Sequence, residues 1–172
     1  MTTANKLTIF RVVLIPVFLV LAYAGQRYWA LAVFVIASLT DMLDGYIARH
    51  YNQITDFGKF MDPLADKVLV MAAMCYFVEV GRMPGWALAI VLLREFAVSG
   101  MRLVAVEQGR VIAAAWSGKF KTTCTMVGLC FMLVFGKYAW MNIFVTVVIL
   151  ITTVYSGIEY FVKNMDVFKD AD

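Results

Sequence analysis

Two acidic segments interrupt an otherwise apolar sequence, and the spacing of their carboxylates decides which fold the chain predicts. The first is Asp41-Met42-Leu43-Asp44-Gly45-Tyr46-Ile47-Ala48-Arg49, and the second, after eight residues, is Gly58-Lys59-Phe60-Met61-Asp62-Pro63-Leu64-Ala65-Asp66. On helices, aspartates three apart in the first segment and four apart in the second share one face. A short connection would turn the two faces toward each other. The segments therefore predict a helical hairpin that gathers four carboxylates.

The composition is that of a membrane protein. Of the 172 residues, 63% are hydrophobic and 16% are charged, and the mean hydropathy is +0.81. Soluble domains carry about 25% charged residues. We therefore predict an all-α, polytopic membrane protein with a single domain over residues 1–172. The net charge of +3 is scattered and forms no basic run, which argues against nucleic acid as a partner.

Apolar windows of about 20 residues predict six transmembrane helices. They cover residues 7–25, 28–48, 60–80, 85–107, 112–136 and 138–162. If both termini lie on one side, Arg27, Arg82 and Lys137 fall on the opposite side, and most other basic residues lie on the terminal side. The positive-inside rule then places both termini and the acidic hairpin in the cytoplasm.

The N-terminal segment also imitates a secretory signal peptide. Lys6 precedes an apolar run, and Ala22-Tyr23-Ala24 supplies the small residues of a cleavage site. Arg11 and Pro16 interrupt the run, and further apolar spans follow it. We therefore expect an uncleaved first helix.

Four carboxylates near a membrane need a compensating charge. Each costs roughly 2.5 kcal/mol or more at the centre of a transmembrane helix, and four that converge would repel one another or take up protons. Divalent cations would neutralise them, and hard oxygen ligands select magnesium, manganese or calcium over zinc. The alternative is a set of capping or interfacial acids, which suits Asp56 near the connection. Gly45 and Ala48 favour the metal site, because small residues on the acidic face leave room for a ligand.

The spacing D-x2-D-G-x2-A-R-x8-G-x3-D-x3-D resembles the signature of the CDP-alcohol phosphotransferases, and all eight of its positions are filled. The resemblance implies a six-helix membrane enzyme, usually a homodimer, with two divalent ions, Mg²⁺ or Mn²⁺, in each site. Enzymes of this family transfer a phosphatidyl or phosphoalcohol group from a CDP-linked donor and release CMP.

The same resemblance implies roles for the signature residues. The implied metal ligands are Asp41, Asp44, Asp62 and Asp66. Asp66 would also be the general base that deprotonates the attacking hydroxyl. The residues implied to bind the donor, CDP-diacylglycerol, are Gly45, Ala48, Arg49 and, in the connecting loop, Thr55.

The segment from Asn5 to Arg11 allows two interpretations. It can be a helix start, in which Asn5 or Thr8 caps the helix and Arg11 extends to the membrane interface. Similar segments in the family line the nucleotide site of the donor. The resemblance therefore makes Asn5 and Thr8 candidates for binding CDP-diacylglycerol.

Basic residues also occur inside the fourth and fifth predicted spans. Arg94 lies well inside its span, where an unpaired charge is costly. Guanidinium groups can bind phosphate bidentately, so these residues predict a pocket for a phosphorylated acceptor. The alternative is that they are ordinary basic residues on the cytoplasmic side, as the positive-inside rule expects. The expected pocket residues are Arg94, Arg102, Lys119 and Lys121.

Three further stretches, 94–102, 118–122 and 156–161, resemble those of bacterial phosphatidylglycerophosphate synthases within the family. This resemblance implies sn-glycerol 3-phosphate as the acceptor, phospholipid biosynthesis as the role, and the bacterial cytoplasmic membrane as the location, with the active site facing the cytoplasm. Phosphatidylglycerol, serine or an inositol phosphate are alternative acceptors. A divalent-cation channel or carrier is the alternative from another class, although Gly45, Ala48 and Arg49 favour nucleotide binding.

Overall fold

The structure is a computed structural model that describes residues 3–50, 56–110, 112 and 115–166. Within these ranges it describes all side chains except those of residues 3–7, 41–50, 56–63 and 66.

Six helices make up the described part of the chain, and no strand occurs in it. They are α1 (Thr3–Tyr23), α2 (Arg27–His50), α3 (Asp56–Glu79), α4 (Gly85–Glu107), α5 (Trp116–Phe135) and α6 (Ala139–Lys163). The predicted all-α class is confirmed for these residues.

The helix bounds differ from the predicted spans mainly at three starts. Helices α1 and α3 each begin four residues earlier than predicted, because a helix satisfies its own backbone and continues into polar sequence. Helix α5 begins at Trp116 rather than at residue 112. Ala115, its N-cap, has an extended backbone with φ −65° and ψ 149°, so the helix does not begin before Trp116.

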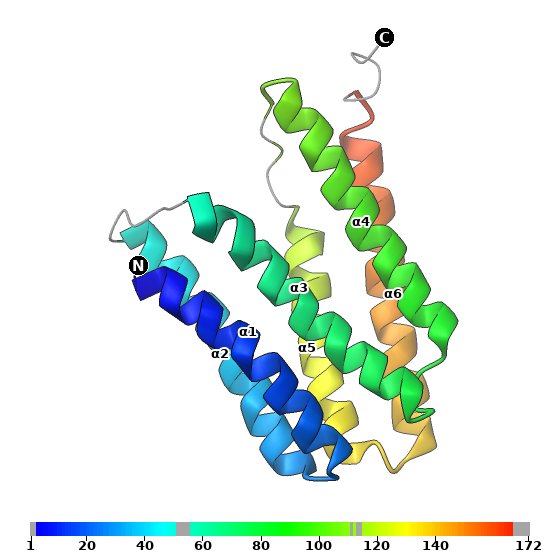
Figure 1. Cartoon of the computed structure of the whole chain (residues 1–172). Helices are drawn as coiled ribbons and strands as arrows, with labels where there is room; N and C mark the ends of the chain where they lie inside the picture. Colours follow the sequence, from blue (N-terminus) through cyan, green and yellow to red (C-terminus); the bar gives the residue numbers. More distant parts are fainter. Residues whose placement is uncertain (1–2, 51–55, 111, 113–114, 167–172) are drawn as a thin grey trace.

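The helices run alternately up and down (Figure 1). We call the end that holds the start of α1, the end of α2, the start of α3 and the end of α6 the terminal end. The opposite end, the connection end, holds the three short connections at residues 24–26, 80–84 and 136–138.

Buried aromatic and aliphatic side chains hold the bundle together. Helix α1 packs on α2 and α3, α5 packs on α2 and α6, and α4 packs on α6. Phe18, Phe34, Phe77 and Met132 are fully buried where these helices meet, and the rings of Phe18 and Phe34 lie 5.6 Å apart. The packing fixes which ends of the helices lie together.

Two glycines make the connections short. Gly25 and Gly81 have φ of 75° and 70°, a left-handed conformation that glycine adopts without strain. The amides of Gln26 and Arg82 donate to the carbonyls of Leu21 and Phe77 at 2.9 and 2.8 Å, which is the hydrogen bond of a Schellman helix end. A basic residue follows each turn: Arg27 begins α2, and Arg82 comes directly after Gly81.

Helices α5 and α6 are long and apolar enough to cross a membrane among the described residues, with mean hydropathies of 1.2 and 2.0. Shorter apolar helical stretches cover residues 8–23 and 27–40. Large apolar side chains also point outward elsewhere: Leu93, Phe96 and Leu103 on α4 are 71%, 72% and 72% exposed. Apolar surface of this extent is typical of a protein whose surroundings are not water.

Candidate active site

The four signature aspartates lie on α2 and α3. Asp41 and Asp44 belong to the second half of α2, and Asp62 and Asp66 to the first half of α3. These two helices contact each other, and α2 ends where α3 begins, at the terminal end (Figure 1). The backbone thus brings both acidic segments to one end, as the hairpin prediction requires. The aspartate side chains are not among those described, so their coordination remains a prediction.

Several other candidates also lie outside the described side chains. Gly45, Ala48 and Arg49 belong to the last turns of α2, and Asn5 to the first turn of α1. Thr55 falls between α2 and α3 in residues 51–55, outside the described residues. Among the side chains that the structure does describe, no three His, Cys, Asp or Glu residues lie close enough to hold a metal ion.

Thr8 and Arg11 occupy a buried face of α1. Both side chains are 0% exposed, and they are three residues apart, so they share this face. Helix α1 begins at Thr3, which places Thr8 in the second turn and excludes it as the cap. Arg11 does not extend to an interface, as the alternative interpretation required. Arg11 is thus a fully buried cation on the same face as Thr8, a placement that sequence reasoning missed.

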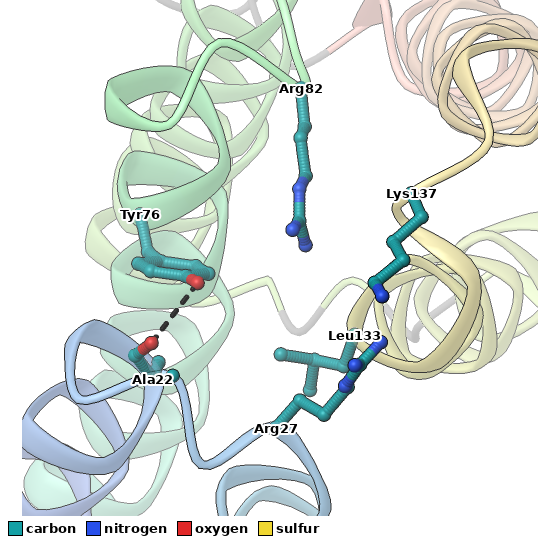
Figure 2. Close-up of a pocket in the computed structure, with 7 residues that line it drawn as sticks. Ala22, Arg27, Tyr76, Arg82, Leu133 and Lys137 are labelled. Carbon is teal, nitrogen blue, oxygen red and sulfur yellow. Dashed lines mark hydrogen bonds between the residues drawn. The ribbon is translucent and has the colours of Figure 1, made fainter.

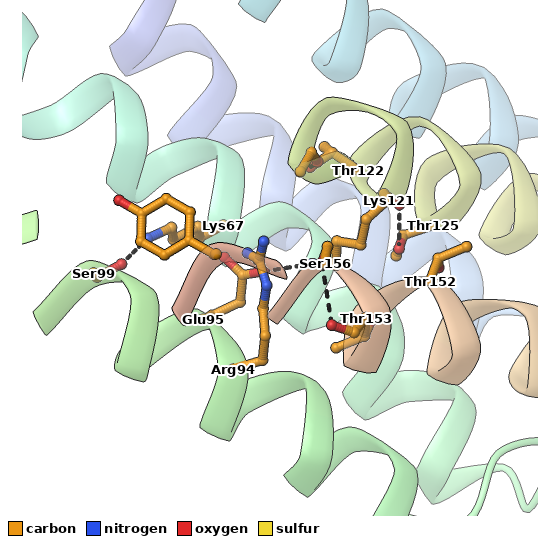
Figure 3. Close-up of polar contacts among 12 residues, drawn as sticks. Lys67, Arg94, Glu95, Ser99, Lys121, Thr122, Thr125, Thr152, Thr153 and Ser156 are labelled. Atoms are coloured by element: carbon orange, nitrogen blue, oxygen red, sulfur yellow. Dashed lines mark hydrogen bonds and ion pairs between the residues drawn. The ribbon is translucent and has the colours of Figure 1, made fainter. Parts of the chain in front are cut away.

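A carboxylate on α4 joins two of the four predicted acceptor residues (Figure 3). Oε1 of Glu95 accepts hydrogen bonds from Nη1 of Arg94 at 3.0 Å and from Nζ of Lys121, on α5, at 2.5 Å. The side chains of Arg94 and Glu95 are each 13% exposed and that of Lys121 is 5% exposed. One carboxylate therefore orients two cations in a largely water-free place, where an anionic ligand would be held strongly.

One hydrogen-bond donor of Arg94 is unpaired among the described residues. Its Nε is buried and has no hydrogen-bond partner in the described structure, and a buried donor without an acceptor costs about 1–3 kcal/mol. Two glycines make room for its side chain. A Cβ at Gly157, on α6, would lie 3.2 Å from Cγ of Arg94, and one at Gly118, on α5, would lie 3.5 Å from Nη2. The site thus holds Arg94 between α5 and α6 with one hydrogen-bonding direction open.

A lysine next to Asp66 links the acidic hairpin to this cluster. Nζ of Lys67 donates to Oγ of Ser99, on α4, at 2.5 Å (Figure 3). Ser99 lies one turn beyond Glu95 on the same helix, so the two face the same way. Sequence reasoning did not single out Lys67, although its position directly after Asp66 was a signal. This hydrogen bond joins α3, at the residue after Asp66, to α4, one turn beyond Glu95.

The other two predicted acceptor residues lie apart from the cluster. Arg102 is exposed; its Nε donates to the hydroxyl of Tyr160 at 3.0 Å, and its guanidinium lies over the ring of Tyr160, 5.4 Å from the centroid. Lys119 is exposed. It precedes Lys121 by two residues, and helix residues at that spacing do not face each other. Of the four predicted acceptor residues, two therefore share the carboxylate of Glu95, and Arg102 and Lys119 lie apart from it.

Replacement of Gly157 by alanine is expected to stabilise the protein less than the same change at Gly100. Alanine gains about 0.5–1 kcal/mol over glycine inside a helix. Gly100 has open space around it and should show this gain, whereas the Cβ at Gly157 must displace the Arg94 side chain. Thermal unfolding of purified Gly157→Ala and Gly100→Ala checks the difference. Equal stabilities would mean that Arg94 is not confined by α6.

Comparisons with known proteins identify the family of the chain. Residues 1–155 match the family described as CDP-alcohol phosphatidyltransferase. The chain is 39% identical over 195 residues to the CDP-diacylglycerol–glycerol-3-phosphate 3-phosphatidyltransferase of Bacillus subtilis, an alignment that covers 98% of this chain and 97% of the relative. It is 37% identical over 167 residues to the protein of the same name from Escherichia coli, with 90% of each chain covered. It is also 36% identical over 170 residues to a probable phosphatidylglycerophosphate synthase of Mycobacterium tuberculosis, with 94% of this chain and 81% of the relative covered.

Proposed function

The chain belongs to the CDP-alcohol phosphatidyltransferase family, and from this membership we propose that it transfers the phosphatidyl group of CDP-diacylglycerol to sn-glycerol 3-phosphate. The products are phosphatidylglycerophosphate and CMP, and the role is phospholipid biosynthesis. The observation that carries the proposal is the alignment of nearly the whole chain with relatives that bear this activity in their names. The complete signature on α2 and α3 supports it.

The reaction exchanges the phosphoanhydride bond of the CDP group for a phosphate ester bond to the acceptor. The free primary hydroxyl of the acceptor attacks the phosphorus that carries the diacylglycerol, and the bond from that phosphorus to the CMP oxygen breaks. Negative charge develops on the leaving CMP, and the hydroxyl proton passes to a base. Asp66 is the proposed base, because a carboxylate one turn beyond Asp62 lies on the acidic face where the acceptor would be held. Positioning and electrostatics supply most of the catalysis in phosphoryl transfer of this kind.

The four aspartates suit the divalent ions that the family uses. They supply only carboxylate oxygens, which are the ligands that Mg²⁺ and Mn²⁺ prefer, and both pairs lie on contacting helices at the terminal end. We propose that Asp41, Asp44, Asp62 and Asp66 hold two such ions. When bound, the ions would neutralise the phosphate oxygens and the charge that develops on CMP.

The donor site is proposed around the start of α1 and the end of α2. Thr8 supports it, because it lies on the buried face of α1, the helix that packs on α2. Gly45 and Ala48 would let the nucleotide approach the α2 backbone closely. The residues proposed to bind CDP-diacylglycerol are Asn5, Thr8, Gly45, Ala48, Arg49 and Thr55.

The acceptor phosphate is proposed to bind at the Glu95 cluster. Arg94 and Lys121 are oriented by Glu95, and the open Nε direction of Arg94 suits a phosphate oxygen. Arg102 and Lys119 are exposed and would act farther out, as positive groups that draw the acceptor toward the site. Because Lys67 connects this cluster to the helix of Asp66, a small acceptor could reach both.

We also propose that all six helices cross the bacterial cytoplasmic membrane, with both termini and the active site on the cytoplasmic side. The outward-facing apolar side chains of α4 support this, as do exposed tryptophans toward both ends, where such residues lie at membrane interfaces. They are Trp29, Trp86 and Trp140 at the connection end and Trp116 at the terminal end. A homodimer in the lipid bilayer is expected from the family resemblance.

A panel of acceptors tests the proposed function. The purified protein, in mixed micelles with CDP-diacylglycerol and Mg²⁺ or Mn²⁺, is expected to release CMP with sn-glycerol 3-phosphate and much more slowly with glycerol, serine, phosphatidylglycerol or an inositol phosphate. Preference for another alcohol would reassign the acceptor. Ion flux in proteoliposomes without any CMP release would favour the channel or carrier.

Lys121→Ala is expected to raise the KM for sn-glycerol 3-phosphate by roughly tenfold to a hundredfold, because it removes a charge-assisted contact of about 1.5–3 kcal/mol. The KM for CDP-diacylglycerol should change little. Arg102→Ala should show a smaller effect in the same direction, because its side chain is exposed. Initial rates at saturating donor and varied acceptor check both variants.

Lys163→Ala is the matched control for Lys121→Ala. Lys163 is an exposed lysine at the same end of the molecule and is paired with Glu159, so its loss should leave the acceptor KM unchanged. If Lys121→Ala and Arg102→Ala both kept the acceptor kinetics of the unmodified enzyme, the phosphate pocket would be wrongly placed.

A further inference from the structure

The connection end carries a second basic cluster that the proposed reaction does not use. One basic residue lies in or directly beside each of the three short connections: Arg27 begins α2, Arg82 lies between α3 and α4, and Lys137 lies between α5 and α6. All three line one cavity of about 170 Å³, together with Ala22, Gly25, Tyr76 and Leu133. Figure 2 shows their charged groups pointing toward this common space from three different segments.

The three cations have no negatively charged partner among the described side chains. None of them forms an ion pair in the described part of the chain; the guanidinium of Arg27 lies only over the ring of Tyr28, 5.7 Å from its centroid. Glu79 is the one described carboxylate at this end of the helices, and its Oε2 accepts a hydrogen bond from the hydroxyl of Tyr23. Among the described side chains, these three positive charges and the one negative charge leave a net charge of about +2 at this end of the helices.

The fold holds these groups near one another despite their repulsion. Arg82 follows the left-handed Gly81, and its amide is fixed to the carbonyl of Phe77 at 2.8 Å. Its side chain lies close against the α5–α6 connection, since a Cβ at Gly136 would come within 2.6 Å of Nη1 of Arg82. Like charges that converge destabilise the folded state unless an anion binds between them. Both arginines are half-buried, which weakens the screening by water.

The chemistry of the cavity suits a phosphate group. Two guanidinium groups can each bind a phosphate bidentately, and the lysine adds a third positive charge. The volume is far above the roughly 10–15 Å³ that a single buried water needs. Exposed Trp29, Trp86 and Trp140 lie at the same end, and tryptophans of this kind mark the depth of lipid headgroups.

We propose that this cavity binds an anionic phosphate group, supplied by a phospholipid headgroup of the outer leaflet or by free phosphate. The site is remote from the signature aspartates, which lie at the terminal end. Its occupant would neutralise the connection end and tie the three connections together. Basic pockets between membrane helices bind anionic headgroups by the same chemistry.

Lipid retention by the purified full-length protein tests the lipid source. Native mass spectrometry in detergent, with phosphatidylglycerol or phosphatidylcholine added, compares the unmodified protein with the double variant Arg27→Gln/Arg82→Gln. Loss of two charge-assisted contacts should weaken phosphatidylglycerol retention at one site by about tenfold or more. Lys163→Gln, which removes one exposed charge at the opposite end, should retain lipid normally.

Thermal unfolding with inorganic phosphate, against chloride at equal ionic strength, tests the other source. Free phosphate is a ligand of the cavity if it raises the Tm of the unmodified protein but not that of the double variant, and if it also displaces the bound lipid. If only phosphatidylglycerol distinguishes the two proteins, the headgroup is the ligand. Equal lipid retention and equal phosphate response in both proteins would overturn the proposal.

Two further measurements separate this proposal from folding defects and from the proposed function. Arg27→Lys/Arg82→Lys keeps both positive charges but loses the planar guanidinium groups, so it should retain phosphatidylglycerol at an intermediate level. It replaces the Gln variant in this test if the Gln variant does not fold. Retention about tenfold or more below that of the unmodified protein would then overturn the proposal. CMP release by the folded double variant at saturating substrates should equal that of the unmodified protein. An unmodified protein without CMP release would defeat the proposed function and leave the lipid result standing.

Discussion

An Asp62→Asn variant is expected to lose CMP release by roughly a thousandfold or more, because a metal site in phosphoryl transfer contributes several kcal/mol of transition-state stabilisation. The amide keeps the shape of the carboxylate but not its charge, and it is a poorer ligand for a hard cation. The same variant should bind Mn²⁺ more weakly. Mn²⁺ binding, followed by electron paramagnetic resonance on the purified protein, provides a measurement that does not depend on turnover.

Asp56→Asn is the matched control for this prediction. It makes the same chemical change on the same helix, six residues earlier and outside the signature, so both CMP release and Mn²⁺ binding should be preserved. Unfolding curves for the two variants should coincide with that of the unmodified protein if the bundle is intact. Near-normal turnover of Asp62→Asn would sink the two-metal proposal, and with it the assignment of Asp41 and Asp44 as ligands.

The helices could be predicted because apolar runs of about 20 residues leave few other structures open to the chain. Helix α4 covers the predicted residues 85–107 without change. The start of α5 could not be predicted in the same way, because the apolar residues before Trp116 carry no signal that distinguishes helix from the extended backbone of Ala115. Hydropathy reports which residues avoid water, and it does not report backbone conformation.

Part of the candidate site could be predicted from the sequence, and part could not. Residue type and spacing single out the aspartates, because carboxylates three or four residues apart share one face of a helix. Pairing between helices depends on packing, which a single sequence does not show: Glu95 as the shared partner of Arg94 and Lys121 comes only from the contact of α4, α5 and α6. The burial of Arg11 is also a consequence of packing. The separation of Lys119 from Lys121 could have been predicted, since residues two apart point to different sides of a helix.

Asp66→Asn is expected to lower kcat by roughly a hundredfold to ten-thousandfold, the usual contribution of a general base, while the affinity for CDP-diacylglycerol changes far less. An amide cannot accept the proton of the acceptor hydroxyl, so the loss falls on the chemical step rather than on donor binding. Steady-state kinetics, with binding of CDP-diacylglycerol measured separately on the purified variant, distinguish these effects.

The comparison with Asp44→Asn decides whether Asp66 is more than a ligand. Asp44 is proposed to hold metal only, so the activity of Asp44→Asn should recover in part as Mn²⁺ is raised to saturation, because added metal offsets a weakened ligand by mass action. Asp66→Asn should stay slow at the same Mn²⁺ concentration, since no amount of metal replaces the missing proton acceptor. If saturating Mn²⁺ restored both variants alike, or if Asp66→Asn lost donor affinity with kcat preserved, Asp66 would be a binding residue and the base would have to be sought elsewhere in the site.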